Sequence, residues 1–230
     1  MVQNWNELPE IMKNEKVKKY FKILNKQKKS LLGKRIFDFV VAVVLLLIVS
    51  FFMLVIAFLI KLDSRGKVFY KQTRVTKNGE LFSIYKFRTM CENADQKGYL
   101  VTIDNDQRIT KIGKILRKYR LDEVPQLLNI IKGDMTFVGT RPEVARYVNQ
   151  YSDEMYATLL LPAGVTSLAS IKFKNEQNLL NSSKDIEKTY MNTILPQKMK
   201  YNLEYLENYS FLGDMKILLV TLIAVLKKGD

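Results

Sequence analysis

The chain has 230 residues and a formal net charge of +14, with 37 Lys and Arg against 23 Asp and Glu. It contains no histidine and one cysteine, Cys91. This composition excludes an intrachain disulfide, histidine-based general-base catalysis and a His-ligated zinc site. The positive charge favours polyanionic partners such as nucleic acid, anionic lipid or phosphorylated substrates.

Residues 1–33 are predicted to form a basic amphipathic arm. Apolar residues recur among the lysines with a spacing typical of a helix lying on a membrane surface. A solvated basic arm fits the same pattern, so both interpretations stay open. The residues expected to face acyl chains in the first case are Ile11, Met12, Val17, Tyr20, Phe21 and Leu24.

Residues 34–62 are predicted to enter a membrane. Phe39 to Ile60 is a run of 22 residues without a charge, and Ser50 is its one polar side chain. As a helix the run is roughly 33 Å long, about one hydrocarbon core. A domain of this size rarely buries a helix that is apolar on every side, and the run is too long for a signal peptide.

The charges around this run favour a re-entrant helix hairpin with both ends in the cytoplasm. Residues 1–38 contain ten Lys and Arg against four Asp and Glu, and six more cations follow between Lys61 and Lys77, against Asp63. The positive-inside rule places both basic flanks on the cytoplasmic side. The alternative is a spanning helix with one basic end forced across. No proline explains a bend, and Ser50-Phe51 is the one interruption.

Residues 63–230 are predicted to form a compact cytoplasmic domain of the α/β class, mostly helical, with a small β-hairpin. Strands at 68–72 and 81–87 are expected to flank a turn at Lys77-Asn78-Gly79. Helices are expected at 109–119, at 123–131 before Gly133, at 142–160 and at 184–208, with 136–139 extended. Residues 91–107 are expected to be a polar loop, with weak pairing at 99–102. Ile217 to Leu226 is too short to span and is expected to dock on the core or lie at the interface.

The segment Arg120-Leu-Asp-Glu-Val-Pro-Gln contains the main candidate catalytic residues, Asp122 and Glu123. Such acids are also ordinary caps and dipole partners at the start of a helix. Adjacent carboxylates point about 100° apart on a helix, so a functional pair would divide two tasks, attack on phosphorus and binding of Mg²⁺. The basic residues nearby can balance a diphosphate or face anionic lipid.

A second candidate is the turn Gly139-Thr140-Arg141-Pro142 after the extended segment. It offers backbone N–H groups and a guanidinium together, as a phosphate cradle does. Alone it is a weak signal, because Gly and Pro occur in turns of every kind.

Together these motifs resemble the bacterial sugar transferases, also called monotopic phosphoglycosyl transferases. The resemblance runs from Lys34 to Glu143, and more loosely to Lys228. It rests on KRIFDF, the apolar run, IKLDSRGKVFYKQTRVTKNGELFSIYKFRTM and RITKIGKILRKYRLDEVPQLLNIIKGDMTFVGTRPE in that order.

The resemblance implies transfer of a sugar-1-phosphate from a UDP-sugar to a polyprenyl phosphate, usually undecaprenyl phosphate, with Mg²⁺. It implies that Asp122 attacks the phosphate on the sugar, that UMP leaves and that the lipid phosphate then displaces Asp122. Glu123 is the implied metal-associated residue. The matching substrate- and phosphate-binding positions are Lys86, Arg88, Arg117, Arg141 and Pro142.

The family's re-entrant helix implies a catalytic domain on the cytoplasmic face of the bacterial inner membrane, in surface polysaccharide synthesis such as exopolysaccharide or capsule. Homo-oligomers and other glycan-assembly enzymes are further partners to consider. Three departures from the family pattern occur; the first concerns the bend of the membrane helix, and the last, in a region expected to bind the donor, leaves the donor sugar open. They are Ser50-Phe51 for Ser-Pro, Thr140 for the first proline of Gly-Pro-Arg-Pro, and Leu161-Pro-Ala-Gly-Val-Thr-Ser for Arg-Pro-Gly-x-Thr-Gly.

Two other classes of function compete with the transferase. A non-catalytic membrane-anchored basic module that binds anionic lipids or partner proteins explains the anchor and the charge. It does not explain why YKFRTM, LDEVPQ and GDMTFVG occur together. Nucleic-acid binding is not favoured, because the aromatic residues are not interleaved with arginines on a recognisable strand or helix.

Overall fold

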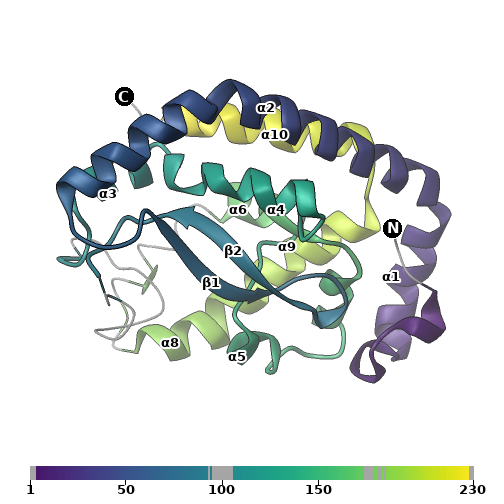
Figure 1. Ribbon diagram of the computed structural model, residues 1–230. Helices are drawn as coiled ribbons and strands as arrows, with labels where there is room; N and C mark the ends of the chain where they lie inside the picture. The colour runs from purple at the N-terminus through teal and green to yellow at the C-terminus, as the bar shows by residue number, and fades with distance from the viewer. Residues whose placement is uncertain are drawn as a thin grey trace.

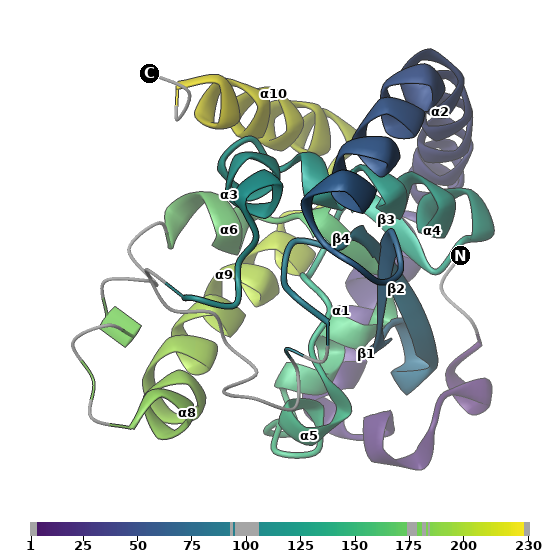
Figure 2. The same ribbon diagram turned by 60° about the vertical axis from the view of Figure 1, so that its left-hand side comes forward.

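A long helix lies across one side of a mostly helical domain that contains two small sheets (Figures 1 and 2). The computed structural model describes residues 4–92, 94, 106–173, 179–180, 183 and 185–227. The expected α/β class fits this arrangement. The predicted pairing of residues 99–102 lies outside the described residues.

The first half of the chain comprises, in order, η1 Trp5–Glu7, η2 Glu10–Met12, α1 Glu15–Lys26, α2 Lys28–Asp63, β1 Phe69–Val75, η3 Lys77–Gly79, β2 Leu81–Phe87, α3 Lys111–Lys118, η5 Leu121–Gln126 and α4 Leu127–Lys132, where η denotes a 3₁₀ segment. The second half comprises β3 Met135–Val138, α5 Ala145–Val148, η6 Met155–Leu160, β4 Ala163–Thr166, α6 Leu168–Lys172, α8 Ile186–Thr189, the π-helical η7 Tyr190–Ile194, α9 Leu195–Glu207 and α10 Phe211–Lys227.

The predicted β-hairpin is confirmed. β1 and β2 pair antiparallel from Phe69 opposite Phe87 to Val75 opposite Leu81. The turn needs a left-handed backbone, which Asn78 and Gly79 supply with φ of 57° and 78°. One face of β2 is buried through Phe82 and Ile84 in a core cluster with residues of α2 and α4, so the hairpin lies beneath the long helix.

A second sheet, of two parallel strands, was not predicted. β3 pairs with β4, Met135 opposite Ala163 and Val138 opposite Thr166. Beyond β3, the backbone passes so close to β4 that a Cβ on Gly164 would lie 2.2 Å from the carbonyl oxygen of Gly139. The segment expected to be extended at 136–139 corresponds to β3, but β4 contains a glycine and lies far away in sequence, so the pairing of the two strands has no local signal.

Among the predicted helices, the one at 142–160 is wrong. The structure has α5 and η6 there, separated by residues 149–154, which include the helix-disfavoured residues Asn149, Ser152 and Asp153. The run from Ile186 to Glu207 is helical throughout, as expected. Gly133 ends α4 with φ of 96°, as its place in the sequence indicated.

The N-terminal arm packs onto the domain. Asn14 caps α1 by accepting a hydrogen bond from the Val17 N–H at 2.9 Å. Of the residues predicted to face acyl chains, four are buried in the largest core cluster, namely Met12, Val17, Tyr20 and Leu24. Phe21 packs against this cluster and is partly buried. These side chains therefore do not face acyl chains, whereas Ile11 is exposed as expected.

Helix α2 packs along the domain over its whole length. A stripe of apolar side chains, spaced three or four residues apart, faces the β2, α3 and α4 core clusters. The stripe consists of Ala42, Leu46, Val49, Met53, Ile56 and Ile60. The opposite face is exposed and apolar, with Leu47, Phe51, Phe52, Leu54 and Phe58 more than half exposed.

The structure has one unbroken helix where a re-entrant hairpin was expected. α2 runs from Lys28 to Asp63 and arches gently over the domain (Figure 1). Ser50 donates to the carbonyl of Leu47 at 2.8 Å and does not interrupt the helix. By length and composition α2 is able to cross a membrane.

Both ends of α2 are nevertheless fixed to the same domain. Near the N-terminal end, Arg35 donates to the carbonyls of Ile130 and Ile131 at 2.6 and 2.9 Å, and so caps α4. At the C-terminal end, Asp63 accepts from the N–H of Ile112 at 3.0 Å and so helps to cap α3.

The close approach of β3 and β4 predicts that Gly164→Ala is strongly destabilising. Its Cβ would meet backbone atoms of Gly139 at 2.2 to 2.5 Å, and backbone cannot rotate away as a side chain can. We expect a loss of about 1–3 kcal/mol in the free energy of unfolding, measured by denaturation of the detergent-solubilised chain. Gly33→Ala is the control, because nothing lies within 4 Å of its Cβ position. Equal melting temperatures for the two variants would contradict this packing.

Candidate active site

The candidate site forms where α3 ends and η5 begins. Arg120 adopts a left-handed backbone, with φ of 57°, and reverses the chain between the two elements. For a residue with a long side chain this conformation is uncommon and costs about 1 kcal/mol or more. The turn brings Arg117 of α3 and the two acids of η5 to the same place. η5 is 3₁₀ rather than the α-helix expected from residue 123 onward.

Asp122 and Glu123 lie in the first turn of η5 and are buried, with 8% and 9% exposure. Neither caps the helix, because the N-cap is Arg120 and no side-chain capping bond is present. The capping interpretation of Asp122 therefore does not hold. Val124 follows the two acids in η5 and packs against the cluster that contains Ile60 of α2. The site therefore lies directly beneath the long helix.

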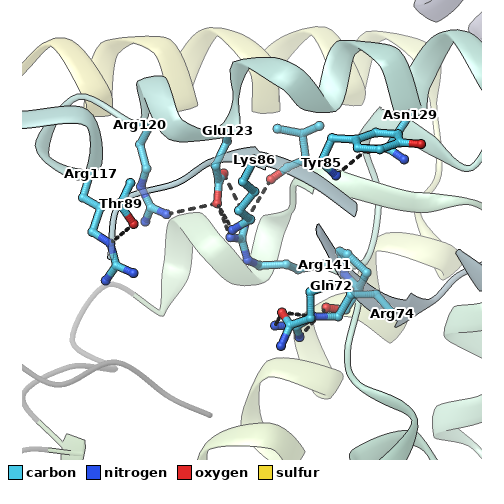
Figure 3. A network of polar contacts seen from close by, with 12 residues as sticks. Gln72, Arg74, Tyr85, Lys86, Thr89, Arg117, Arg120, Glu123, Asn129 and Arg141 are labelled. Atoms are coloured by element: carbon cyan, nitrogen blue, oxygen red, sulfur yellow. Dashed lines mark hydrogen bonds and ion pairs between the residues drawn. The ribbon is translucent and has the colours of Figure 1, made fainter. Parts of the chain in front are cut away.

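Glu123 is surrounded by three cationic side chains from three different elements (Figure 3). Lys86 of β2 lies 2.9 Å from its Oε1. Arg141 donates to both carboxylate oxygens, closely to Oε1 and at 3.4 Å to Oε2. The Arg120 guanidinium lies 3.7 Å away. Glu123 thus joins the strand β2, the turn after β3 and the turn before η5.

Burial and the neighbouring charges together shift the pKa values of the two acids in opposite directions. Burial alone would raise the pKa of Glu123, but Arg141 and Lys86 outweigh it and hold this pKa well below its ordinary value. Burial, and next the charge of Glu123, raise the pKa of Asp122, against Lys86, Arg120 and Arg117. Burial also lowers the pKa of Lys86, although Glu123 opposes this.

Asp122 differs from Glu123 because no hydrogen bond or ion pair of its side chain is found among the described residues. Its carboxylate lies beside cations without being bonded to one. A carboxylate in that state keeps its lone pairs available to a reacting atom. Arg117 lies nearby on α3, where its Nε donates to the Thr89 hydroxyl at 2.8 Å.

Arg141 is held in place from two sides. Besides Glu123, it contacts the carbonyl of Val165 in β4 at 3.2 Å, and the ion pair with Glu123 raises its pKa. The carbonyl of Pro142 accepts from Arg74 of β1 at 3.2 Å. The close contact of Gly139 with Gly164 is what allows the turn to reach both partners.

Arg88 has a different environment from the other predicted phosphate-binding residues. Its guanidinium caps the C-terminal end of α2. It donates to the Ser64 carbonyl at 2.7 Å, to the Ser64 hydroxyl at 3.0 Å and to the Arg65 carbonyl. Gly66 makes this possible, because a Cβ there would lie 2.1 Å from the Arg88 guanidinium. These contacts favour a structural role for Arg88.

The structure therefore brings together Asp122, Glu123, Lys86, Arg117 and Arg141, and leaves Arg88 and the Pro142 ring outside this group. Sequence reasoning counted Arg120 only as a nearby cation and missed its contact with Glu123. It also missed Thr89 and the Val165 carbonyl. A left-handed arginine has no sequence signal, because glycine and asparagine are the residues that normally indicate this conformation.

Magnesium binding by this site would depend on substrate. No group of three or more His, Cys, Asp or Glu side chains able to hold a metal occurs in the part of the chain that the structure describes. The adjacent carboxylates of Asp122 and Glu123 fit the usual mode of Mg²⁺, which takes one or two carboxylates together with substrate phosphates and waters. Because cations already contact Glu123, the residues fit a Mg²⁺ shared with a diphosphate.

Comparison with known proteins identifies the family of this chain. The chain belongs to the bacterial sugar transferase family, whose model matches residues 29–228. It is 36% identical over 197 residues to the UDP-N-acetylgalactosamine-undecaprenyl-phosphate N-acetylgalactosaminephosphotransferase of Aeromonas hydrophila, covering 84% of this chain and 43% of that protein.

Two further relatives have similar coverage of this chain. The uncharacterized sugar transferase EpsL of Bacillus subtilis is 35% identical over 193 residues, which is 84% of this chain and 87% of EpsL. The UDP-glucose:undecaprenyl-phosphate glucose-1-phosphate transferase of Escherichia coli is 32% identical over 192 residues, 82% of this chain and 39% of that protein. The chain thus spans less than half of the Aeromonas and Escherichia proteins.

The contrast between the two acids predicts opposite effects on stability. Glu123→Gln leaves Lys86, Arg141 and Arg120 without their anion and should lower the free energy of unfolding by about 1–3 kcal/mol, because the carboxylate is buried while the cations keep part of their solvent exposure. Asp122→Asn removes a buried charge that has no bonded partner, and should change it by less than about 1 kcal/mol. Urea denaturation of the two variants beside the parent chain measures both.

The contribution of Glu123 to the free energy of unfolding is expected to depend on pH. A lowered pKa means that the contribution of Glu123 is present above the pKa of the unfolded chain and is lost as the pH falls through the folded value. The difference in free energy of unfolding between the parent chain and Glu123→Gln should therefore be complete at pH 7 and shrink below about pH 4. A gap that widened on acidification would contradict the ion-pair assignment.

Proposed function

We propose that this chain is a phosphoglycosyl transferase that moves a sugar-1-phosphate from a UDP-sugar to undecaprenyl phosphate. The observation that carries the proposal is an unpaired, buried Asp122 next to a Glu123 held by three cations, directly beneath an apolar helix. The names of the Aeromonas and Escherichia relatives supply the class of donor and acceptor. Surface polysaccharide synthesis is the corresponding pathway.

Asp122 is the proposed nucleophile. A carboxylate oxygen of Asp122 forms a bond to the phosphorus attached to the sugar, while the bond from that phosphorus to the bridging oxygen breaks and UMP leaves with the electron pair. An oxygen of the lipid phosphate then attacks the same phosphorus, and the Asp122 carboxylate departs. The product is polyprenyl-diphosphate-sugar, and two moderate displacements replace one difficult step.

The cations around the acids suit the charge of the donor. Lys86, Arg117, Arg120 and Arg141 carry four positive charges against the two of Asp122 and Glu123. The excess is suited to a diphosphate, and preorganised charges act most strongly on the charge that develops during phosphoryl transfer. Glu123 keeps Lys86 and Arg141 at fixed positions, so its first task is to orient these cations. Arg88 is assigned instead to the end of α2.

Mg²⁺ remains part of the proposal, with Glu123 as the residue that would hold it. When bound, the metal would supply charge neutralisation on the diphosphate. The protein's own cations orient the donor phosphates, and the unpaired carboxylate of Asp122 faces no competing bond. Release of UMP completes the first half-reaction.

The position of α2 supports a membrane attachment in which both of its ends stay on one side. Arg35 and Asp63 fix the two ends to the same domain, and exposed cations flank both ends, including Lys28, Lys29, Arg65 and Lys67. The exposed apolar face between them would lie in the lipid. By the positive-inside rule this side is the cytoplasm of the bacterial inner membrane.

The non-catalytic lipid-binding module is the competing function. It accounts for the apolar face and the basic ends of α2. It gives no reason for two adjacent buried acids among partly exposed cations, an arrangement that is typical of functional sites. Measurement of UMP with Mg²⁺, undecaprenyl phosphate and a panel of UDP-sugars separates the two functions.

The covalent step predicts an adduct on one residue. Full-length chain in membranes, incubated with Mg²⁺ and the UDP-sugar that supports UMP release, should gain a phosphosugar detectable by intact mass spectrometry. Asp122→Asn should lose both the adduct and UMP release while remaining folded. Asp153→Asn is the matched control, because this acid is exposed and distant in sequence from the site.

An adduct that persists in Asp122→Asn would reject this residue as the nucleophile. Release of no UMP from any donor in the panel, with folded protein, would favour the lipid-binding module.

The proposed attachment of α2 predicts that the residues flanking its two ends lie on the same side of the membrane. In a Cys91→Ser background, Lys28→Cys and Lys67→Cys should both resist an impermeant maleimide added outside intact spheroplasts. Both should react once the membrane is permeabilised. Labelling of one position alone from outside would establish a helix that spans the membrane.

A further inference from the structure

A buried charge cluster lies at the junction of α2 and α10, away from the candidate active site. The Lys34 Nζ is 2.7 Å from Asp214 Oδ2 and 3.6 Å from Asp38 Oδ2. All three side chains are buried, and Asp214 has no exposed surface at all. Lys34 and Asp38 belong to α2 and Asp214 belongs to α10, so the ion pair directly joins the two helices.

Neutral groups complete the cluster and fix it to the domain. Thr136 of β3 donates its hydroxyl proton to Asp38 Oδ2. Tyr205 of α9 donates to Asp214 Oδ1 at 2.9 Å. Beside the charges, the rings of Phe37 and Phe211 meet edge to face, with centroids 5.4 Å apart. The first turn of α10 is thus tied directly to α2 and α9, and through Lys34 and Asp38 to β3.

Such a cluster determines orientation more than stability. Desolvation of three charged groups offsets most of their attraction, but the hydrogen bonds permit only one arrangement of the partners. Because Asp214 is tied inward, the residues three and seven positions further on lie on the same face of α10. Ile217 then faces the core with 8% exposure, and Thr221 contacts Thr166 at 2.9 Å.

The other face of α10 is left apolar and open. Leu212 is 80% exposed, and Leu219 and Leu222 are more than half exposed, with Val220 and Ile223 next to them. No charged residue occurs between Lys216 and Lys227. In both ribbon views α10 lies on the same side of the domain as α2, and the two helices diverge from their junction (Figures 1 and 2).

We propose that α10 is a second lipid-contacting helix, and that the Lys34–Asp38–Asp214 cluster fixes it to α2 so that both apolar faces enter the bilayer as one surface. The occupant is a lipid bilayer because the exposed face of α10 continues that of α2 on one side of the molecule. A helix of this kind lies in the interface rather than spanning it. The inference rests on the membrane attachment of α2 proposed above.

Depth-dependent fluorescence quenching tests the proposal on the full-length chain. In a Cys91→Ser background, single cysteines are introduced by Leu219→Cys or Leu222→Cys and labelled with a bimane probe. The chain is reconstituted in vesicles of phosphatidylcholine and phosphatidylglycerol that contain lipids brominated along the acyl chain. Phe51→Cys on the exposed face of α2 reports the attachment of α2, and Asn149→Cys on an exposed position of the domain is the aqueous control.

The expected result is loss of fluorescence at residues 219, 222 and 51, and no loss at residue 149. Loss at 51 without loss at 219 and 222 would overturn the role of α10 while leaving the attachment of α2 intact. No loss at 51 would overturn both. Energy transfer between labelled copies at 219, without quenching by lipid, would mean that a second copy covers this face, and would also overturn the proposal.

The role of the charge cluster is tested separately with Asp214→Asn. This variant keeps an oxygen that accepts from Tyr205 but removes the charge that attracts Lys34. We expect weaker quenching at residue 222 and unchanged quenching at residue 51. Glu207→Gln, which removes a surface ion pair with Lys19, is the matched control and should leave both unchanged. Equal quenching at 222 in all three proteins would show that the cluster does not fix α10.

Discussion

The contact between Glu123 and its cations is the interaction on which the rest of the site depends. It joins the hairpin through Lys86, the turn after β3 through Arg141 and the left-handed turn before η5 through Arg120. None of these three segments is fixed by its own secondary structure alone. Because Glu123 is buried, it holds these cations at fixed positions, and the neighbouring Asp122 lies in a positive environment without a bonded partner among the described residues.

A second constraint is geometric. Arg141 reaches Glu123 only because β3 and β4 approach each other at Gly139 and Gly164, where no side chain would fit. Likewise, Arg88 reaches the end of α2 only because Gly66 leaves room for its guanidinium. In both places a glycine leaves room for an arginine, but only Gly139 and Gly164 act on the site, because Arg141 contacts Glu123 whereas Arg88 caps α2.

The long helix connects these features to a membrane. Its inner stripe packs on the clusters that hold the hairpin, α4 and Val124, and its outer face is apolar. Asp63 and Arg88 act on the two sides of its C-terminal end, one capping α3 and the other capping α2 itself. The proposed reaction between a water-soluble donor and a lipid acceptor needs a site at the boundary of the two phases, and the packing of Val124 places Asp122 close under this apolar helix.

The sequence by itself determined the features that depend on local pattern. These include the apolar helix, the hairpin with its Asn78-Gly79 turn, the end of α4 at Gly133, and the choice of Asp122, Glu123, Lys86, Arg117 and Arg141 as candidate site residues. Only the tertiary structure decided that α2 is unbroken with both ends on one domain, that Val17 and Leu24 are buried, that β4 pairs with β3, and that Arg88 caps a helix. These features depend on contacts between residues distant in the chain, and on a left-handed Arg120, for which neither periodicity nor composition carries a signal.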